Sequence, residues 1–106
     1  MSLDLAFQSA TELARRLRRR ELSAVELLQH YLRRIERLNP AINAVVVLDA
    51  DRALQRAKSA DAALGRGELW GPLHGLPMTV KESFDLPGLP TTWGYEAMRG
   101  NIATQT

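Results

Sequence analysis

Apolar side chains recur at every third or fourth position in three stretches of the chain, a spacing that predicts three amphipathic helices. We expect these helices over about residues 10–21, 24–38 and 50–64. The first two are close together in sequence and are expected to form an antiparallel pair that packs on a larger body. The apolar face of the third is mostly alanine, and such small side chains indicate close approach to a sheet or another helix.

Residues typical of helix ends support these boundaries. A serine followed three residues later by a glutamate forms a capping box, in which the two side chains satisfy unpaired amide groups reciprocally. This pattern occurs at Ser9–Glu12 and at Ser23–Glu26. The other expected boundaries are Asn39-Pro40 at the end of the second helix, Asp49 as the N-cap of the third and Gly65 as its stop.

Two short apolar runs have the composition of buried strands, over residues 44–48 and 76–81. Strand, helix and strand in this order predict a βαβ unit with a right-handed crossover. Residues 85–106 are rich in Gly, Pro and Thr and are expected to form a loop. The predicted fold class is therefore α/β, with a helical pair before the βαβ unit. Two strands alone make a marginal sheet, so we expect this fold to be incomplete in these 106 residues.

Composition narrows the kinds of site that the chain can hold. Hydrophobic residues make up 45% and charged residues 25%, which indicates a globular rather than a disordered chain. The absence of cysteine excludes disulfides, thiol nucleophiles and thiolate metal sites. His30 and His74 show no metal-ligand spacing, and we expect no metal and no cofactor. Because no signal peptide and no membrane-length apolar run is visible, we expect a cytoplasmic protein.

Five arginines cluster at the end of the first predicted helix: Arg15, Arg16, Arg18, Arg19 and Arg20. One interpretation is a patch for RNA or for a membrane surface. The favoured one is a solvated helix face, whose cations suit the negative end of the helix dipole and on which Glu12 pairs with Arg16. No interleaved aromatic residues accompany the cluster, so we expect neither nucleic acid nor membrane as a partner.

Lys81 ends the second predicted strand, at the position where an α/β sheet usually presents ligand-binding and reactive groups. Only two of the 14 basic residues are lysine, namely Lys58 and Lys81. Arginine cannot act as a base whereas a buried lysine can, which favours proton-transfer chemistry at Lys81. From these residues alone, however, a strand-end lysine that points to water is the simpler interpretation.

A long motif surrounds this lysine. The string Gly-Pro-Leu-x-Gly-Leu-Pro-x-x-Val-Lys-Glu begins at Gly71, and Gly-Leu-Pro-Thr-Thr-Trp-Gly runs from Gly88 to Gly94. Together these strings resemble the N-terminal, catalytic-lysine segment of the amidase signature family. The resemblance implies that residues 1–106 are the N-terminal portion of one large α/β domain built around a mixed, twisted sheet. It also implies hydrolysis of a carboxamide by a nucleophilic serine, a bridging serine in a cis peptide linkage and a lysine.

Of that triad only the lysine maps onto this chain, at Lys81. The resemblance implies that it is neutral at rest and acts as a general base through the bridging serine. The family's two serines lie in a Gly- and Ser-rich stretch that has no counterpart here, so we expect these 106 residues alone to be inactive. Ser83 is the one internal candidate for a self-contained Ser–Lys pair, and it is disfavoured because both side chains point outward from one strand face.

Other residues beside the motif are expected to have structural roles. His74 is interpreted as a hydrogen-bonded loop residue rather than part of a substrate entrance. Loop packing is favoured over an apolar acyl or aryl pocket for three aromatic residues, which are Trp70, Trp93 and Tyr95. Thr91 and Thr92 are expected to satisfy backbone groups in the turn that follows Leu89-Pro90.

The predicted function is that of an amidase with a small-molecule amide as substrate. Its expected partner is the downstream part of the same domain, and a homo-oligomer is also compatible with the sequence. Two alternatives stay open: the amidase subunit of a tRNA-dependent amidotransferase, and a non-catalytic module in which the paired helices dock on another protein. A Gly- and Ser-rich stretch after Thr106 would favour an enzyme, and a stop codon there would favour the module.

Overall fold

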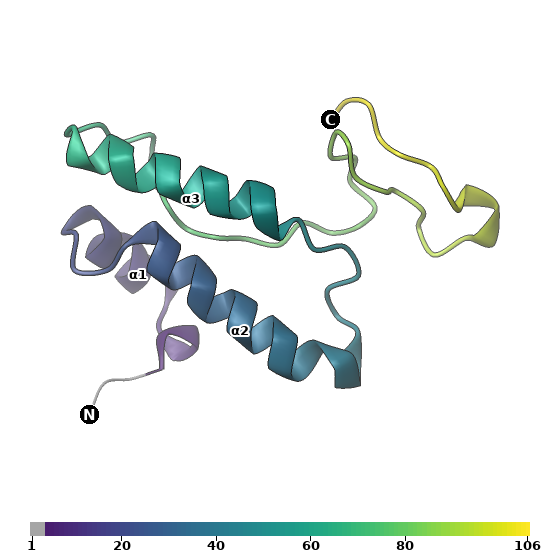
Figure 1. Ribbon diagram of the computed structural model, residues 1–106, viewed down its shortest axis with the longest axis horizontal. Helices are drawn as coiled ribbons and strands as arrows, with labels where there is room; N and C mark the ends of the chain where they lie inside the picture. The colour runs from purple at the N-terminus through teal and green to yellow at the C-terminus, as the bar shows by residue number, and fades with distance from the viewer. Residues whose placement is uncertain (1–3) are drawn as a thin grey trace. The chain divides into compact units, whose positions relative to one another are not determined.

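The computed structural model describes residues 4–106 (Figure 1). Its elements are η1 (Leu5–Phe7), α1 (Ala10–Arg18), α2 (Ala24–Ile42), α3 (Ala50–Gly65) and η2 (Glu96–Met98), where η denotes a single turn of 3₁₀-helix. The described chain divides into two compact units. The first, of residues 4–42 and 49–77, contains all three α-helices, and the second, of residues 43–48 and 78–106, consists of loops and η2.

The predicted capping boxes form to different extents. At α2 the box is complete, since Ser23 Oγ accepts the Glu26 N–H at 3.0 Å and Glu26 Oε1 accepts the Ser23 N–H at 3.2 Å. At α1 only the Ser9 half forms, with Ser9 Oγ accepting the Glu12 N–H at 3.1 Å. The Glu12 carboxylate turns instead to Arg15, to which it is hydrogen-bonded and ion-paired. The predicted pair between Glu12 and Arg16 is therefore wrong.

The first helix ends earlier than expected, at Arg18 instead of about residue 21. Arg20 adopts a left-handed backbone with φ of +59°. The Glu21 N–H then bonds the Arg16 carbonyl and the Arg20 N–H bonds the Leu17 carbonyl, both at 3.0 Å. These two bonds make a complete Schellman motif, in which an arginine occupies the position that usually holds glycine.

The third helix ends in the same motif, just beyond its predicted stop. Gly65 is the last helical residue, and the left-handed position belongs to Gly67, with φ of +79°. The Gly67 N–H bonds the Leu64 carbonyl at 3.0 Å and the Glu68 N–H bonds the Ala63 carbonyl at 2.9 Å. At the other end Asp49 occupies the N-cap position as predicted, but its side chain makes no capping hydrogen bond and pairs with Arg52 at 2.8 Å instead.

The second helix continues through its predicted stop at Asn39-Pro40 and ends at Ile42. Pro40 lies in the last turn, where the missing N–H costs only the bond to the Glu36 carbonyl and the ring's fixed φ suits a helix. Asn43 follows with φ of +48°, a left-handed conformation that asparagine tolerates better than most residues. The left-handed backbone of Asn43, and not Pro40, therefore stops α2 after Ile42.

All three helices contribute to one buried cluster in the first unit. Its members are Leu13, Leu17, Leu22, Ala24, Leu27, Leu28, Ala57 and Ala60. Leu17 and Leu27 are fully buried, and each buried leucine contributes about 1.5–3 kcal/mol of hydrophobic stabilisation. Helix α3 lies alongside α2 (Figure 1). The buried residues of α3 are all alanines, and Ala57 and Ala60 belong to the cluster shared with α2, which confirms that the small side chains serve a close approach to another helix.

The α/β prediction is wrong for the part of the chain that the structure describes. Residues 44–48 and 76–81 form no strand, and residues 4–106 contain no sheet. The single β-bridge joins Pro90 to Ile102, which lie outside both predicted strands. Apolar, β-branched residues favour a strand only when neighbouring strands pair with it, and neither run finds such a partner here. The observed regular structure is helical.

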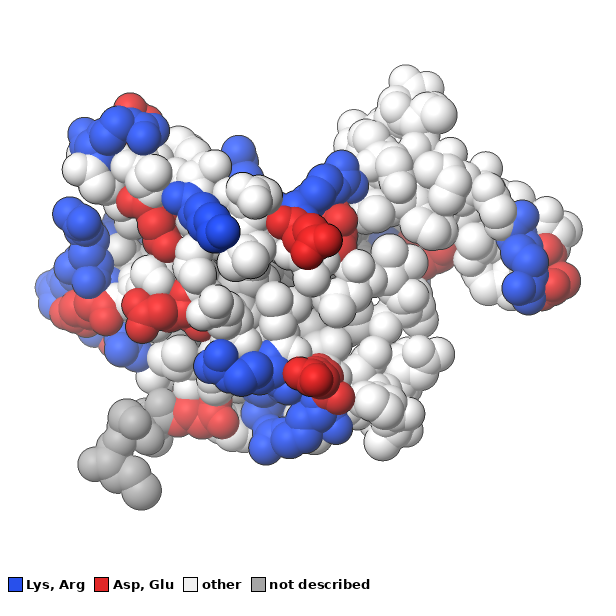
Figure 2. All heavy atoms as spheres, viewed as in Figure 1, with Lys and Arg blue, Asp and Glu red and all other residues white. Residues whose placement is uncertain are grey.

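Charges of both signs alternate over the helices (Figure 2). In the arginine cluster, Arg15 pairs with Glu12, while Arg16 donates to Gln8 Oε1 at 3.1 Å and lies 3.9 Å from a Glu21 oxygen. Arg18, Arg19 and Arg20 are exposed. Part of this cluster is therefore neutralised within the first unit. No helix within residues 4–106 combines the length and the apolar character needed to cross a bilayer.

Candidate functional site

Lys81 lies in the second unit, at the first position of a tight turn. The Phe84 N–H donates to the Lys81 carbonyl at 3.0 Å, which closes the turn over residues 81–84. The Lys81 side chain is exposed. Ser83 is half-buried, and within residues 4–106 neither side chain makes a hydrogen bond to the other. The structure thus gives no support to a self-contained Ser83–Lys81 pair.

Glu82, which directly follows Lys81, accepts three hydrogen bonds from the second part of the motif. One oxygen of Glu82, Oε1, accepts the Thr92 N–H at 2.6 Å and the Thr92 hydroxyl at 3.1 Å. The other, Oε2, accepts the Trp93 N–H at 2.9 Å. These donors, with the Thr92 N–H foremost, hold the pKa of the Glu82 carboxyl below its usual value of 4.5. Glu82 is therefore an ionised acceptor whose two oxygens are both engaged.

Sequence reasoning did not single out Glu82. The available signal was its place directly after Lys81 and ten residues before Thr92 of the Thr-Thr-Trp-Gly string, within the same motif. A carboxylate that accepts neighbouring backbone N–H groups stabilises a turn strongly, because each hydrogen bond is charge-assisted. Glu82 therefore joins the two halves of the motif.

The threonines of the motif behave differently from one another. Thr92 does serve the turn as expected, because its hydroxyl donates to Glu82 and accepts the Gly94 N–H at 3.4 Å. Thr91 uses its backbone: its N–H bonds the Asn101 carbonyl at 3.1 Å, and its carbonyl accepts the Asn101 side-chain amide at 2.9 Å. Its side-chain Oγ1 is buried without a hydrogen-bond partner. The predicted side-chain role is confirmed for Thr92 and wrong for Thr91.

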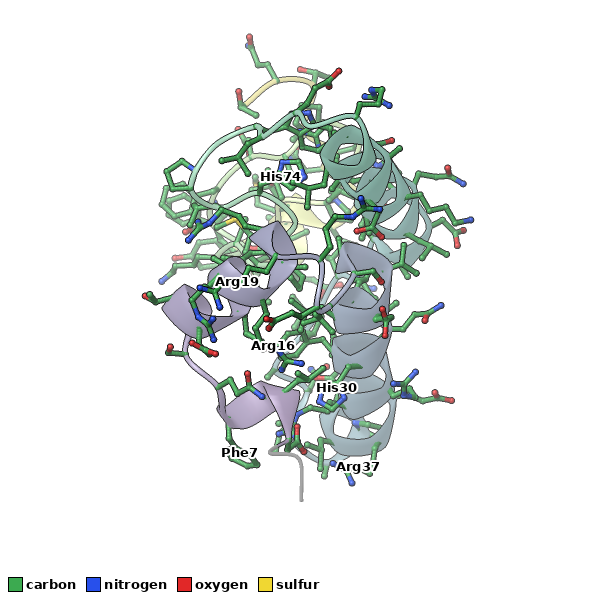
Figure 3. All side chains as sticks on the ribbon, turned by 90° about the vertical axis from the view of Figure 1, so that its left-hand side faces the viewer. Phe7, Arg16, Arg19, His30, Arg37 and His74 are labelled. Atoms are coloured by element: carbon green, nitrogen blue, oxygen red, sulfur yellow. The ribbon has the colours of Figure 1, made fainter. Side chains whose placement is uncertain are left out.

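The expectation of a hydrogen-bonded loop histidine is confirmed for His74, which is buried in the first unit beside α3 (Figure 3). Its Nδ1 accepts the Trp70 N–H at 2.9 Å, and its Nε2 lies 2.8 Å from the Ala60 carbonyl, to which it donates. Trp70 packs its ring on His74, with centroids 4.7 Å apart, and on Arg56, whose guanidinium carbon lies 4.1 Å from the Trp70 centroid. Both ring nitrogens are used, so His74 closes the loop and offers nothing to a substrate.

The other two aromatic residues of the motif belong to the second unit. Trp93 is 62% exposed and Tyr95 is 67% exposed. Neither is buried by its neighbours in that unit, so the predicted packing role, observed for Trp70, does not extend to them.

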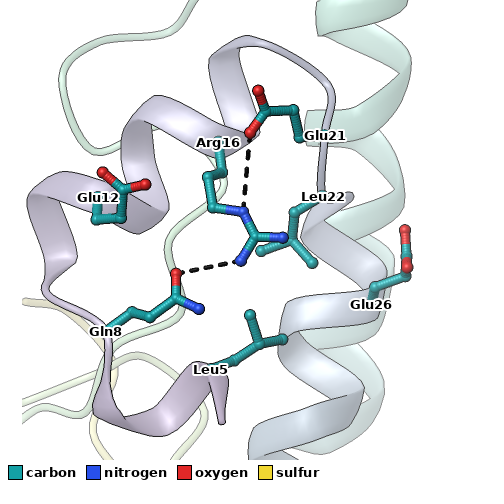
Figure 4. A pocket seen from close by; sticks show the side chains of 7 residues that line it. All are labelled: Leu5, Gln8, Glu12, Arg16, Glu21, Leu22 and Glu26. Carbon is teal, nitrogen blue, oxygen red and sulfur yellow. Dashed lines mark hydrogen bonds and ion pairs between the residues drawn. The ribbon is translucent and has the colours of Figure 1, made fainter. Parts of the chain in front are cut away.

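A hollow of about 690 Å³ lies between η1, α1 and α2 in the first unit (Figure 4). Its lining residues are Leu5, Gln8, Glu12, Arg16, Glu21, Leu22 and Glu26. Arg16 is committed to Gln8 and Glu21, and Glu26 is committed to the capping box. The lining contains no histidine, serine or lysine, and nothing in it resembles an acid–base pair with free groups.

A second cluster ties η1 to α2. Asp4 Oδ1 accepts the Ala6 N–H at 2.9 Å and lies 2.8 Å from Nε2 of His30, which points from α2 toward the N-terminal turn (Figure 3). The Ala6 hydrogen bond is the main cause of the lowered pKa of the Asp4 carboxyl, with His30 and Arg34 adding to it. His30 therefore has a structural role. No group of three or more potential ligands placed to hold a metal ion occurs within residues 4–106.

Comparison with known proteins assigns this sequence to a family. The model of the family described as Amidase matches residues 26–106, which include Lys81, Glu82 and the Thr-Thr-Trp-Gly string. That match covers most of α2, all of α3 and the whole second unit.

Individual relatives agree with this assignment. The chain is 42% identical over 99 residues to a protein of Acidothermus cellulolyticus named as a subunit of glutamyl-tRNA(Gln) amidotransferase, a match that covers 93% of this chain and 20% of the relative. It is 49% identical over 97 residues to a protein of Burkholderia thailandensis with the same name, covering 92% and 19%. It is 39% identical over 101 residues to an acylamidase of Rhodococcus erythropolis, covering 95% and 21%.

The chain thus spans about a fifth of the length of the curated relatives that it matches. The family match over residues 26–106 and the motif around Lys81 lead to one conclusion: this chain belongs to the amidase signature family.

Proposed function

We propose that this chain supplies the catalytic lysine, Lys81, of an amidase that hydrolyses a carboxamide to a carboxylic acid and ammonia or an amine. The observation that carries the proposal is the position of Lys81 inside the family match, within the Gly-Pro-Leu-x-Gly-Leu-Pro-x-x-Val-Lys-Glu string. The reaction also needs two serines, which would come from chain outside these 106 residues.

In the proposed reaction a serine oxygen attacks the carboxamide carbon while its proton passes to the bridging serine, whose own proton passes to Lys81. The tetrahedral intermediate then collapses, the C–N bond breaks and a proton returns through the same relay to the leaving nitrogen. Water then attacks the resulting ester carbon while the relay takes its proton. The ester bond to the serine breaks, the proton returns through the relay to the serine oxygen, and the carboxylic acid leaves. Lys81 ends each half-reaction in the protonation state in which it began.

The proposal is tested in the longer amidase chain that contains this segment, by measuring ammonia release from propionamide and benzamide. Lys81→Ala is expected to lower kcat/KM by about 10²–10⁴-fold, the usual contribution of general acid–base catalysis. Lys81→Arg is expected to be as inactive, because arginine does not give up its proton. The matched control is Lys58→Ala, which removes an exposed lysine of α3 and should leave kcat/KM unchanged.

Two results would reject the proposal. One is near-normal activity of Lys81→Arg, which would rule out proton transfer by this residue. The other is an intact mass of the natural protein equal to that of 106 residues, because the two serines would then be absent. The isolated 106-residue chain is expected to release no ammonia from either amide.

A second function within the same family is suggested by the names of the relatives. Two of those described above are named as a subunit of glutamyl-tRNA(Gln) amidotransferase, and the identity to the acylamidase is close to theirs. An amidotransferase subunit would act on glutamyl-tRNA(Gln) together with further subunits. Hydrolysis of simple carboxamides by the purified protein alone favours an independent amidase, whereas activity only with glutamyl-tRNA(Gln) and added subunits favours the second function.

A further inference from the structure

Glu82 connects its own turn to a second turn that begins ten residues after Glu82, at Thr92. The first is the 81–84 turn, closed by the Phe84 N–H on the Lys81 carbonyl. The second begins at Thr92, where Glu82 accepts three hydrogen bonds from two consecutive residues at distances between 2.6 and 3.1 Å. Because Glu82 directly follows Lys81, any displacement of the Glu82 backbone also displaces the backbone of the lysine.

The turn over residues 92–95, to which Glu82 is hydrogen-bonded, has a strained backbone. The Tyr95 N–H donates to the Thr92 carbonyl at 2.9 Å, and the two central residues, Trp93 and Gly94, have φ of +54° and +74°. These are the dihedral signs of a type I′ turn, whose central positions favour Asn, Asp and Gly. A bulky tryptophan in the left-handed region is an outlier, and such strain persists only where the surroundings enforce it.

Burial of the tryptophan ring does not offset this strain within the second unit, because Trp93 is 62% exposed. The compensation comes from Glu82, whose carboxylate binds the N–H groups of Thr92 and Trp93 in this conformation. Strained backbone of this kind concentrates at functional sites, where it fixes the placement of a reacting group.

The far side of the loop is anchored independently. The Gly88 N–H bonds the Ala103 carbonyl at 2.8 Å, the Ala103 N–H bonds the Leu89 carbonyl at 3.0 Å, and Pro90 bridges to Ile102. These contacts attach the residues just before the Thr92 turn to the segment around residue 102. Through Glu82, the lysine-bearing turn is tied to this anchored loop.

We propose that Glu82 is a positioning residue for Lys81: its three hydrogen bonds to Thr92 and Trp93 hold the lysine-bearing turn in the place that amide hydrolysis needs. The inference rests on the function proposed above. Glu82 itself does not exchange protons with substrate, because both of its oxygens accept hydrogen bonds within the loop.

The test compares variants of the longer amidase chain, with kcat expressed per mole of folded protein and folding monitored by thermal unfolding. Glu82→Gln keeps the shape but places an NH₂ group against a backbone N–H. It is expected to lower kcat by about 10–100-fold with KM changed less than threefold, as for a catalytic group displaced by about 1 Å. Glu82→Asp, which restores the charge, is expected to recover part of that loss.

Glu96→Gln is the matched control. It removes a carboxylate in the same unit that bonds only the exposed Arg99, and it should leave kcat and KM unchanged. If the Glu82 variants do not fold, Thr92→Val decides, because it removes one donor to Glu82 and keeps both backbone N–H groups. It is then expected to lower kcat to a smaller degree.

The possible failures are distinguishable. Wild-type kcat in folded Glu82→Gln, with Lys81→Ala inactive, overturns the positioning role and leaves the proposed function standing. A drop in kcat that Glu82→Asp does not relieve at all, or unchanged kcat in Thr92→Val where that variant decides, also overturns it. Activity in Lys81→Ala rejects the proposed function itself, whatever Glu82 does.

Discussion

The Asp61 carboxylate, in the middle of α3, caps the N-terminus of α2 by accepting the N–H of Ala24 at 2.7 Å. Its second oxygen accepts the next N–H, that of Val25, at 3.1 Å. Ser23 satisfies the following N–H within the capping box. The start of α2 is therefore completed jointly by a local cap and by a side chain 37 residues away, which links helix formation to helix packing.

Asp61→Asn is expected to destabilise the chain by about 1–2 kcal/mol, because one backbone donor then faces an amide NH₂ and the charge-assisted bonds are lost. Urea unfolding followed by circular dichroism measures the change. Asp51→Asn, an exposed carboxylate in the first turn of α3, is the control, with a loss of at most about 0.5 kcal/mol from the helix dipole. Equal losses in both variants would contradict the capping role.

A second prediction concerns the left-handed arginine that ends α1. Arg20→Gly is expected to stabilise the folded chain by about 0.5–1 kcal/mol. Glycine removes the energetic cost of a left-handed arginine, and this gain exceeds the loss that comes from the greater conformational entropy of glycine in the unfolded chain. Its neighbour Arg19 has φ of −81°, so Arg19→Gly should instead destabilise by about 0.5–1 kcal/mol. The opposite signs are read from the two urea midpoints, and a loss of stability in Arg20→Gly would show that its side chain outweighs the strain.

The helix ends show both where prediction from sequence succeeds and where it fails. Caps depend on residues three apart, so both serines could be identified from sequence, and they do cap their helices. The end of α1 could not, because arginine has no intrinsic preference for the left-handed region and the motif forms only with the surrounding packing. The capping role of Asp61 could not be predicted either, because no neighbouring residue in the sequence distinguishes a solvent-exposed aspartate on a helix from one that bonds another helix.

The predicted strands failed for a related reason. A run such as residues 44–48 carries the right side chains, but strand formation depends on hydrogen-bonded neighbours that composition does not supply. At the candidate site, the motif identified Lys81 and its family, while the link from Glu82 to the Thr92 turn emerged only from the geometry. A motif therefore predicts which residues matter before it predicts what each one contacts.

The loop after α3 contains a glycine whose need is steric as well as conformational. Gly75 and Gly67 share a φ of +79°. A Cβ added to Gly75 would lie 3.3 Å from the Ala24 Cβ and 3.4 Å from Leu17 Cδ1, whereas a Cβ added to Gly67 would meet no atom within 4 Å.

Gly67→Ala should therefore destabilise the fold by about 1–2 kcal/mol through backbone strain alone. Gly75→Ala should cost about 1 kcal/mol more, because both neighbours are buried and cannot easily move. Urea unfolding of the two variants tests this difference, and equal losses would mean that the loop shifts to accept the methyl group.

The last prediction is a pH dependence of the Glu82 contact. The carboxyl group has a lower pKa in the folded chain than its usual 4.5, so its hydrogen bonds contribute fully above about pH 4.5. That contribution is lost as the pH falls through 4.5 toward the folded-state pKa, because a protonated carboxyl is a poorer acceptor for the N–H groups of Thr92 and Trp93. In ¹H–¹⁵N NMR spectra of the 106-residue chain, the amide proton resonances of Thr92 and Trp93 should move upfield together in acid. Their protection from solvent exchange, relative to the intrinsic rate at each pH, should fall. In Glu82→Gln neither resonance should show this titration. An unchanged acid titration in that variant would assign the effect to another carboxylate, such as Glu96, and would remove the link between the lysine-bearing turn and the Trp93 turn.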